Sequence, residues 1–162
     1  MAWAVLLLAS GDDSAAEEAA GRERYWSRAR AWLRDHPLRE HASRLRGRAQ
    51  VEEFDVHPSE LSRILQRPDV LVTGVSASEA IGVVGSASSV EVYAPTGSRG
   101  RIVADHALLQ GAGPVRIRWA PDALWPLLEH ASDRRAPRAA ILVDLLEADE
   151  PRARREAGRV LG

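Results

Sequence analysis

The chemistry open to this chain is limited by two reactive residue types that it lacks. Its 162 residues contain no Cys and no Lys, so its formal positive charges are all Arg. The absence of Cys excludes disulfides, thiol nucleophiles and thiolate metal sites, and the absence of Lys excludes Schiff bases and phosphate-loop lysines. The net charge of −1 excludes an overall basic field that would attract nucleic acid. Any chemistry of the side chains must therefore come from hydroxyl, imidazole, carboxyl or guanidinium groups.

Acidic and His side chains occur twice with the spacing of a site. Glu53, Asp55 and His57 alternate along a predicted strand, so they share one face and could offer carboxylate and imidazole ligands to a divalent ion. We favour a polar strand edge instead, because no fourth ligand follows at a predictable spacing. Asp105 and His106 are adjacent and could form an acid–base dyad, but we favour an exposed pair on a helix. We therefore expect no metal site and no dyad.

Arginine is concentrated in the predicted helices of residues 22–50, which hold nine Arg against three acids. Trp26 and Trp32 lie among these arginines, and nucleic-acid-binding proteins use Arg for phosphate and aromatic rings for bases. Aromatic residues at helical spacing more often belong to a core, so we favour a solvated helix face with both Trp side chains buried. The candidate binding residues of this segment are Arg39, Arg44, Arg46 and Arg48.

A second pair of arginines lies on a predicted strand near the C-terminal third of the chain. Arg116 and Arg118 alternate with Val115, Ile117 and Trp119, so the two guanidinium groups share one face and the apolar side chains share the other. Neighbouring arginines on a strand could bind an anionic ligand. We favour the alternative that local acids pair with them.

The segment 85–93 has part of the pattern of a nucleotidyl-transfer site. Gly85 and Ser86 precede a predicted strand that carries Glu91 and Tyr93 on alternate positions. Nucleotidyltransferases place Gly-Ser before a strand with two alternate carboxylates, because two metal ions need both ligands on one face. Tyr93 occupies the second position here, and one carboxylate cannot hold two metal ions. An enzyme of this kind, or a degenerate relative that retains Gly85, Ser86 and Glu91, is the alternative hypothesis for function.

Four segments together resemble the AbiEi family of type IV toxin–antitoxin antitoxins and the effector halves of related actinobacterial transcriptional regulators. The resemblance covers roughly residues 58–120 and rests on a Gly-x-Ser-Ala segment, a following Gly, a strand ending in Pro and a further strand. The family pattern has Gly-Leu where this chain has Gly82-Val83. These segments are Thr73–Ala77, Ile81–Val84, Val90–Pro95 and Val115–Trp119, and the motif residues are Gly74, Ser76, Ala77, Gly82, Glu91 and Tyr93.

The resemblance implies an α/β antitoxin domain that follows a winged-helix DNA-binding domain and takes part in repression of its own promoter. It also implies two candidate partners, a cognate toxin and an upstream winged-helix domain. The residues before position 58 do not have the pattern of a winged helix. We therefore do not expect this chain to bind DNA alone.

The alternation of apolar runs predicts an α/β or α+β fold with a small sheet of three to five strands flanked by helices. Predicted helices at Ser14–Asp35 and Pro37–Ala49 form an N-terminal arm in residues 1–50, and residues 51–162 form an α/β regulatory domain. The alternative is that the arm and this domain are one continuous domain. The chain ends in a helical pair, Ala139–Leu146 and a last helix with an inner stripe of Ala153, Ala157 and Val160. We expect parallel pairing where a helix separates two strands. The predicted strands lie near residues 52–56, 70–73, 90–94 and 115–119.

The sequence as a whole favours a non-enzymatic regulatory or antitoxin-like module that binds a partner protein, DNA or a small effector. Met1–Ser10 is apolar but has no basic segment before it and is too short to span a bilayer. We expect it to be buried on the body of a cytoplasmic protein. We expect no membrane contact and no bound cofactor.

Overall fold

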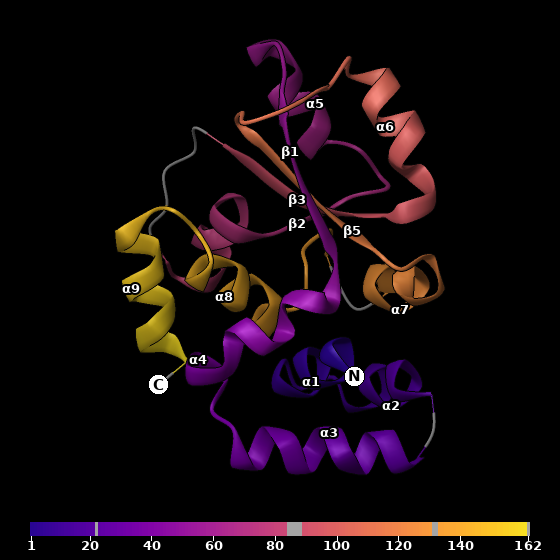
Figure 1. Cartoon of the computed structure of the whole chain (residues 1–162), viewed down its shortest axis with the longest axis vertical. Helices are drawn as coiled ribbons and strands as arrows, with labels where there is room; N and C mark the ends of the chain where they lie inside the picture. Colours follow the sequence, from indigo (N-terminus) through magenta and orange to yellow (C-terminus); the bar gives the residue numbers. More distant parts are fainter. Residues whose placement is uncertain (22, 84–88, 131–132, 162) are drawn as a thin grey trace.

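The computed structural model describes residues 1–21, 23–83, 89–130 and 133–161 (Figure 1). One five-stranded sheet with the order β2-β3-β5-β1-β4 is surrounded by helices, which confirms the predicted α/β or α+β class. All four predicted strands are present, and β4 is an additional short one. The strands are β1 (Gln50–Asp55), β2 (Leu71–Val72), β3 (Val90–Pro95), β4 (Leu109–Gln110) and β5 (Val115–Ala120).

The expected parallel pairing holds for one pair of neighbouring strands. β3 and β5 are parallel, and the chain between them includes the helix α6 (Arg99–Asp105). β2 is antiparallel to β3, although the helical segment η3 (Gly74–Ile81) separates them, and β1 is antiparallel to both β4 and β5. The sheet is therefore mixed. Between β2 and β3 the chain reverses direction through η3 instead of crossing over the sheet, so these two strands pair antiparallel.

One face of the sheet is an ordinary apolar layer. Val92, Ile117 and Trp119 point to this face, and they pack with Ile64 of α5 (Leu61–Leu65) and with Ile102 of α6. This arrangement confirms the predicted alternation on β5, in which the apolar side chains lie opposite the two arginines. The polar positions of the strands are consequently directed to the opposite face.

Helices from both ends of the chain cover the opposite face (Figure 1). The segment α8 (Arg138–Leu146) is buried from Ala139 to Leu145, as its apolar sequence predicts. The last helix, α9 (Pro151–Val160), packs on α8 through Ala153 and Ala157. Val160 was predicted to continue this inner stripe and does not, since it lies 43% exposed. Two further elements precede α8, namely η5 (Asp122–Leu124) and α7 (Trp125–His130).

The N-terminal apolar run forms a helix that is buried on nearly every side. In this helix, α1 (Ala2–Ala9), Trp3 to Leu7 are all buried, and α1 contacts α8 as well as its neighbours in sequence. An all-apolar helix requires such surroundings, because it has no polar face for solvent. The apolar cluster around it includes residues from 1–50 and from 51–162 alike. Within the described part of the chain, no helix is long and apolar enough to cross a membrane.

The two long helices predicted for the N-terminal arm are each divided. The first is interrupted at Gly21, whose φ of +69° ends a helix in the left-handed conformation. Asp12, not Ser14, caps its start by accepting a hydrogen bond from Ala15 N at 3.0 Å. The second helix changes after one turn into a 3₁₀ helix that contains Gly47, a poor helix former. The resulting elements are α1 (Ala2–Ala9), α2 (Asp13–Ala20), α3 (Glu23–Asp35), α4 (Leu38–His41) and η1 (Ala42–Arg48).

Gly113 provides a test of how tightly the turn before β5 packs on β1. A Cβ atom at this position would overlap the backbone of Phe54 and Asp55, which has no side-chain freedom to yield. We expect Gly113→Ala to lower the free energy of unfolding by about 1–3 kcal/mol. Gly100→Ala is the matched control, because its Cβ meets open space in α6 and Ala is favoured in helices by up to about 1 kcal/mol. Urea unfolding that shows equal effects for the two variants would contradict this packing.

Candidate functional site

Strand register brings the acidic and Arg side chains into rows on the face covered by α8. Arg116 lies opposite Glu53 of β1 on one side and Glu91 of β3 on the other. Arg118 lies beside Tyr93 of β3. Directly paired residues share a face and have Cβ atoms about 5 Å apart. The sequence-distant strands therefore build one polar layer on an otherwise buried face of the sheet.

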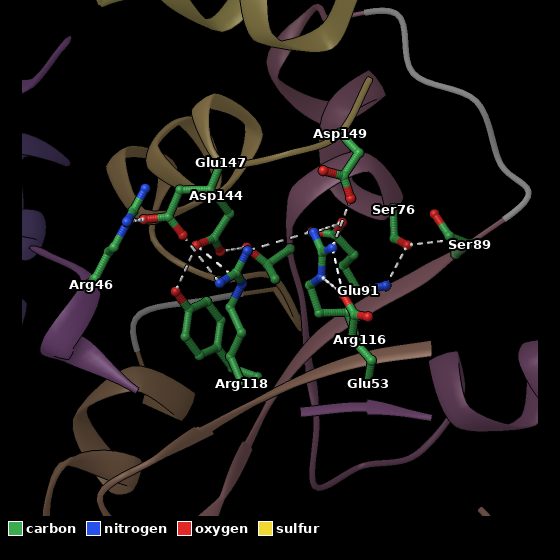
Figure 2. Close-up of polar contacts among 12 residues, drawn as sticks. Arg46, Glu53, Ser76, Ser89, Glu91, Arg116, Arg118, Asp144, Glu147 and Asp149 are labelled. Atoms are coloured by element: carbon green, nitrogen blue, oxygen red, sulfur yellow. Dashed lines mark hydrogen bonds and ion pairs between the residues drawn. The ribbon is translucent and has the colours of Figure 1, made fainter. Parts of the chain in front are cut away.

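Arg116 is held by three carboxylates (Figure 2). Its Nη2 donates to Glu53 Oε1 at 2.7 Å and to Asp149 Oδ2 at 3.1 Å, whereas its Nη1 donates to Glu91 Oε1 at 3.4 Å. Asp149 comes from the connection between α8 and α9. Arg116 therefore links three strands of the sheet to the C-terminal helical pair.

Arg118 and Arg48 meet at the buried carboxylate of Asp144 on α8. Arg118 is 2% exposed, and its Nε lies 3.2 Å from Asp144 Oδ1. Arg48 of η1 also donates to Asp144 Oδ1 and to both oxygens of Glu147 at 3.2 and 2.9 Å. Two guanidinium groups and two carboxylates thus neutralise one another inside the protein.

The remaining oxygen of Asp144 and the ring of Tyr93 complete this network. Thr73 donates its hydroxyl to Asp144 Oδ2, and Tyr93 donates to Asp144 Oδ1 at 3.0 Å. Burial raises the pKa of Tyr93 above its ordinary value, and the neighbouring Asp144 charge raises it further. Tyr93 therefore stays neutral and can donate to Asp144 while it accepts a hydrogen bond from Arg48 Nε at 2.8 Å.

The network reaches the N-terminal helix through the backbone of η1. Trp3 of α1 donates its indole N–H to the Arg48 carbonyl at 2.8 Å. Its ring also packs edge-on against Tyr93, with the centroids 5.1 Å apart. Burial alone would lower the pKa of Arg48, but Asp144 and the other partners outweigh this effect and raise it above its ordinary value. Arg48 is consequently a permanent charge that ties residues 1–50 to the sheet.

Glu91 differs from the other acids because it is poorly compensated. Its side chain is 6% exposed, and Oε2 has no hydrogen-bond partner among the described residues. Arg118 Nη2, a buried donor that also has no hydrogen-bond partner among the described residues, lies 3.9 Å from that oxygen. Burial raises the pKa of Glu91 to about 7, although the Arg118 and Arg116 charges act in the opposite direction. Glu91 is therefore a carboxyl group that titrates near neutral pH.

A cavity of about 500 Å³ opens beside Glu91. Val75 and Ala148 form buried parts of its wall, and Asp149 and Gly113 are exposed at its rim. A second cavity of about 300 Å³ lies on the other side of Arg116 and is lined by Arg46, Arg118 and Glu147. The first cavity is the larger, and its lining also includes Glu53, Ser89, Glu91, Ala112, Pro114, Arg116 and Glu150.

The motif residues of the central stretch are brought together around Glu91. Gly74 has a φ of +52°, and a Cβ there would overlap the Glu91 carboxylate, so both backbone and space require glycine. Ser76 accepts a hydrogen bond from Glu91 N at 2.9 Å and donates to Ser89 O at 3.1 Å. Ala77 is buried, and Gly82 ends η3 with a φ of +76°. The motif therefore fixes the segment that holds Glu91.

The predicted arginine set separates into two groups. Arg39, Arg44 and Arg46 are exposed, as a binding surface requires. The prediction for Arg48 as a surface binding residue was wrong, because this side chain turns inward to Asp144 and is 1% exposed. Arg116 and Arg118 are partnered by acids, as the favoured interpretation expected, but these acids are distant in sequence and not local.

The metal-ligand set and the acid–base dyad that were weighed as alternatives are not assembled in the described residues. Asp105 pairs with Arg67 at 2.8 Å, whereas His106 contacts Glu60 at 2.8 Å, so these neighbours do not form a dyad with each other. The expectation of an exposed pair was wrong for His106, which is 8% exposed at the end of α6. No group of three His, Asp or Glu side chains in that part of the chain could hold a metal ion, and this includes the Glu53, Asp55 and His57 set. Gly85 and Ser86 lie outside the described residues.

Sequence reasoning missed Thr73, Asp144, Glu147 and Asp149. Asp144 could have been recognised from the sequence, since it is the only acid in the run Ala139–Leu146, whose other residues are all apolar. A buried acid requires a cationic partner. Nothing in the sequence indicates that this partner is Arg48, 96 positions away.

No family model, no curated protein and no solved structure matches this chain.

Removal of Asp144 would leave Arg48 and Arg118 buried with too little negative charge. We expect Asp144→Ala to lower the free energy of unfolding by about 3–5 kcal/mol. Asp149→Ala is the control, because the Asp149 side chain is 92% exposed and an exposed ion pair contributes about 0.5 kcal/mol. Thermal unfolding followed by circular dichroism measures both. Similar melting temperatures for the two variants would show that the buried network does not stabilise the fold.

Glu91 should make stability fall as pH rises toward neutrality. Its pKa is raised from 4.5 to about 7 on folding, so between these values the folded chain keeps a proton that the unfolded chain releases. The loss is complete above about pH 7 and amounts to on the order of 3 kcal/mol. Urea unfolding at pH 5 and pH 8 should show this loss in the wild type but not in Glu91→Gln. The exposed Glu18→Gln serves as control, and parallel stability profiles for wild type and Glu91→Gln would refute the assignment.

Proposed function

We propose that this chain is a non-enzymatic regulatory module of the antitoxin type that binds an acidic partner protein in the cytoplasm. The observation that supports this proposal is the distribution of arginine. Arg48, Arg116 and Arg118 are neutralised by acids inside the fold, whereas other arginines gather on the outer side of the terminal helices. The side chains left available therefore favour binding over bond-making chemistry.

The arginine surface spans α4, η1 and α9. Residues 152, 155 and 159 are three and four positions apart, so they follow one side of α9. Arg39 of α4 lies beside Gly158 of α9, where a Cβ would be 3.6 Å from its Nε. Figure 1 shows the C-terminal end of α9 next to α4. The arginine surface is formed by Arg39, Arg44, Arg46, Arg152, Arg155 and Arg159, all of which are exposed.

This surface has an excess of positive charge in a protein whose net charge is −1. Arg159 pairs with Glu156 at 3.5 Å, and Arg46 lies 3.9 Å from Glu147. Arg39, Arg44, Arg152 and Arg155 form no ion pair with any described residue. Unpaired surface charges of one sign attract a complementary surface and accelerate its association.

A protein partner is favoured over DNA by the positions of the tryptophans. Trp32 stacks on His36 with the ring centroids 5.0 Å apart, and Trp26 lies 4.6 Å from the Arg30 guanidinium. Both rings were expected to be buried and are half-buried. Their contacts within the chain leave less of each face for stacking on bases. A cognate toxin with an acidic surface is the partner that best fits the resemblance to the AbiEi antitoxins. An upstream winged-helix domain would supply DNA binding.

Nucleotidyl transfer is the weaker proposal for this chain. Glu91 has no second carboxylate on β3, since Tyr93 at that position bonds Arg48 and Asp144. Glu91 itself lies against Arg116 and Arg118. Two arginines beside the carboxylate oppose the approach of a metal ion.

The test is binding of the protein encoded beside this chain's gene, measured by biolayer interferometry. We expect the double variant Arg39→Gln/Arg155→Gln to bind about tenfold more weakly, because each neutralised rim charge costs up to about 1 kcal/mol. Wild-type binding should weaken with added salt. Arg63→Gln on α5 is the control, because Arg63 is exposed on the opposite side of the sheet.

Three results would contradict the proposal. They are no binding of the neighbouring protein at low salt, equal binding by the wild type and the double variant, and tighter binding of a DNA duplex than of the protein. The duplex is measured in parallel for this reason, since DNA binding by this chain would fall steeply with salt.

A further inference from the structure

We propose that an extended, acidic segment of the partner protein binds as an added strand along the open edge of β1. The inference rests on the proposed function and specifies how the partner is recognised. It depends on two neighbouring features. The β1 edge consists of residues 49–53, and the β1 cavity is the smaller space of about 300 Å³ that Arg46, Arg118 and Glu147 help to line. The partner's backbone would pair with the edge while one of its carboxylates enters the cavity.

The β1 edge has backbone groups without partners. On one side β5 pairs with residues 50–54, whereas on the other side β4 pairs only with the last two residues of β1. The hydrogen bond from Gly111 N to Glu53 O, 3.1 Å long, lies on the β4 side. The N–H and C=O of a strand residue point the same way and alternate along the strand, so those of Val51 also point to this side. No described residue pairs with them there.

The β1 edge is accessible to a partner. Val51 is 45% exposed, and in Figure 1 β1 lies in front of β3 and β5. Proteins commonly protect such an edge with Pro, Lys or other charged side chains, and residues 49–53 contain neither Pro nor Lys. The two acids of this segment bond Arg99 and Arg116 at 2.8 and 2.7 Å, so their charges are neutralised. The edge therefore remains open to strand addition.

The β1 cavity lies where the side chains of an added strand would reach. Val51 and Glu53 line it and point to the face covered by α8, as the register with β5 requires. Alternate side chains of an added strand project to this same face. In peptide recognition by strand addition, backbone hydrogen bonds supply affinity, and pockets for alternate side chains supply specificity. The β1 cavity has the position of such a pocket.

The charge of the β1 cavity favours a carboxylate. Guanidinium groups outnumber carboxylates in its lining, since Arg46, Arg116 and Arg118 stand against Glu53 and Glu147. Complementary charge favours the matching side chain and disfavours the wrong one. An acidic side chain of the partner is therefore preferred at this position over a neutral or basic one.

Arg46 is the lining arginine that remains open to a ligand. Its side chain is 73% exposed, and its ion pair with Glu147 is 3.9 Å long, which is beyond hydrogen-bond distance. The planar guanidinium of Arg can donate two parallel hydrogen bonds to one carboxylate. Arg46 also belongs to the arginine surface, so one partner would contact this surface and the β1 edge together.

A second copy of this chain is a poorer occupant of the β1 edge. It would offer the same residues 49–53, whose two acids are already bonded to Arg99 and Arg116. It would also bring a second arginine surface close to the first, because Arg46 lies beside this edge. Like charges repel one another at such a contact. An acidic partner has neither disadvantage.

The first test is hydrogen–deuterium exchange of the full chain followed by NMR, alone and with the purified protein encoded beside its gene. The outward N–H groups of Val51 and Glu53 should exchange at least about tenfold more slowly in the complex, because an added strand holds them in hydrogen bonds. The N–H groups of Gln50 and Glu52 point to β5. They are the internal control and should change little.

The second test is biolayer interferometry of the same protein with Val51→Pro. Pro is tolerated on an edge strand whose N–H faces solvent, so this variant removes an outward donor and leaves the pairing with β5 intact. We expect it to bind about tenfold more weakly than the wild type. Val51→Thr is the matched control, because Thr keeps the N–H and the branched shape, and it should bind within about twofold of the wild type.

Four results would overturn the inference. They are unchanged exchange at Val51 and Glu53 in a complex that forms, equal binding by the wild type and a folded Val51→Pro, unchanged binding after the acids of the protected partner segment are replaced by amides, and self-association of the wild type that Val51→Pro abolishes. If Val51→Pro does not fold, as judged by circular dichroism, the exchange result decides. These outcomes leave binding through Arg39 and Arg155 intact, whereas absence of all binding would refute the proposed function as well.

Discussion

The structure depends on the neutralisation of Asp144 inside the protein. This side chain is 0% exposed on a helix that is otherwise apolar from Ala139 to Leu146, and an isolated carboxylate there would cost several kcal/mol. Arg48, Arg118, Thr73 and Tyr93 compensate it from four different segments. The packing of α8 on the sheet therefore fixes the positions of those segments as well as burying apolar area.

This constraint connects the ends of the chain to its centre. Arg48 reaches Asp144 only if η1 lies across the sheet, and the Arg48 carbonyl then accepts the indole N–H of Trp3. At the end of α8, Glu147 accepts a hydrogen bond from Arg48 and Asp149 accepts one from Arg116. These carboxylates add to the neutralisation of buried charge around Asp144. The cavity beside Glu91 lies where this compensation is incomplete. The candidate site beside Glu91 and the contacts that hold the fold together thus belong to one network of charged side chains.

The main elements of the fold could be predicted from local patterns. Period-two alternation located β1 and β5, an apolar run located β3, and the apolar run Ala139–Leu146 predicted a buried helix. Strand direction was harder to predict. The chain reverses through η3, so β3 runs antiparallel to β2, and only the packing of the sheet determines this direction. The helix interruptions at Gly21 and after His41 depend on residues with weak helix propensity. Tertiary contacts compete with that propensity and decide where each helix ends.

The sequence by itself determined the residue types available, the exclusion of thiol and lysine chemistry and the shared face of Arg116 and Arg118, and it favoured acids as partners of those arginines. Tertiary structure alone decided which acids they meet, because Glu91, Asp144 and Asp149 come from other segments. It also separated Arg48, which is buried, from Arg39, Arg44 and Arg46, which are exposed. The physical reason is that a charge pattern fixes the face of an element, whereas burial and pairing depend on what packs against that face.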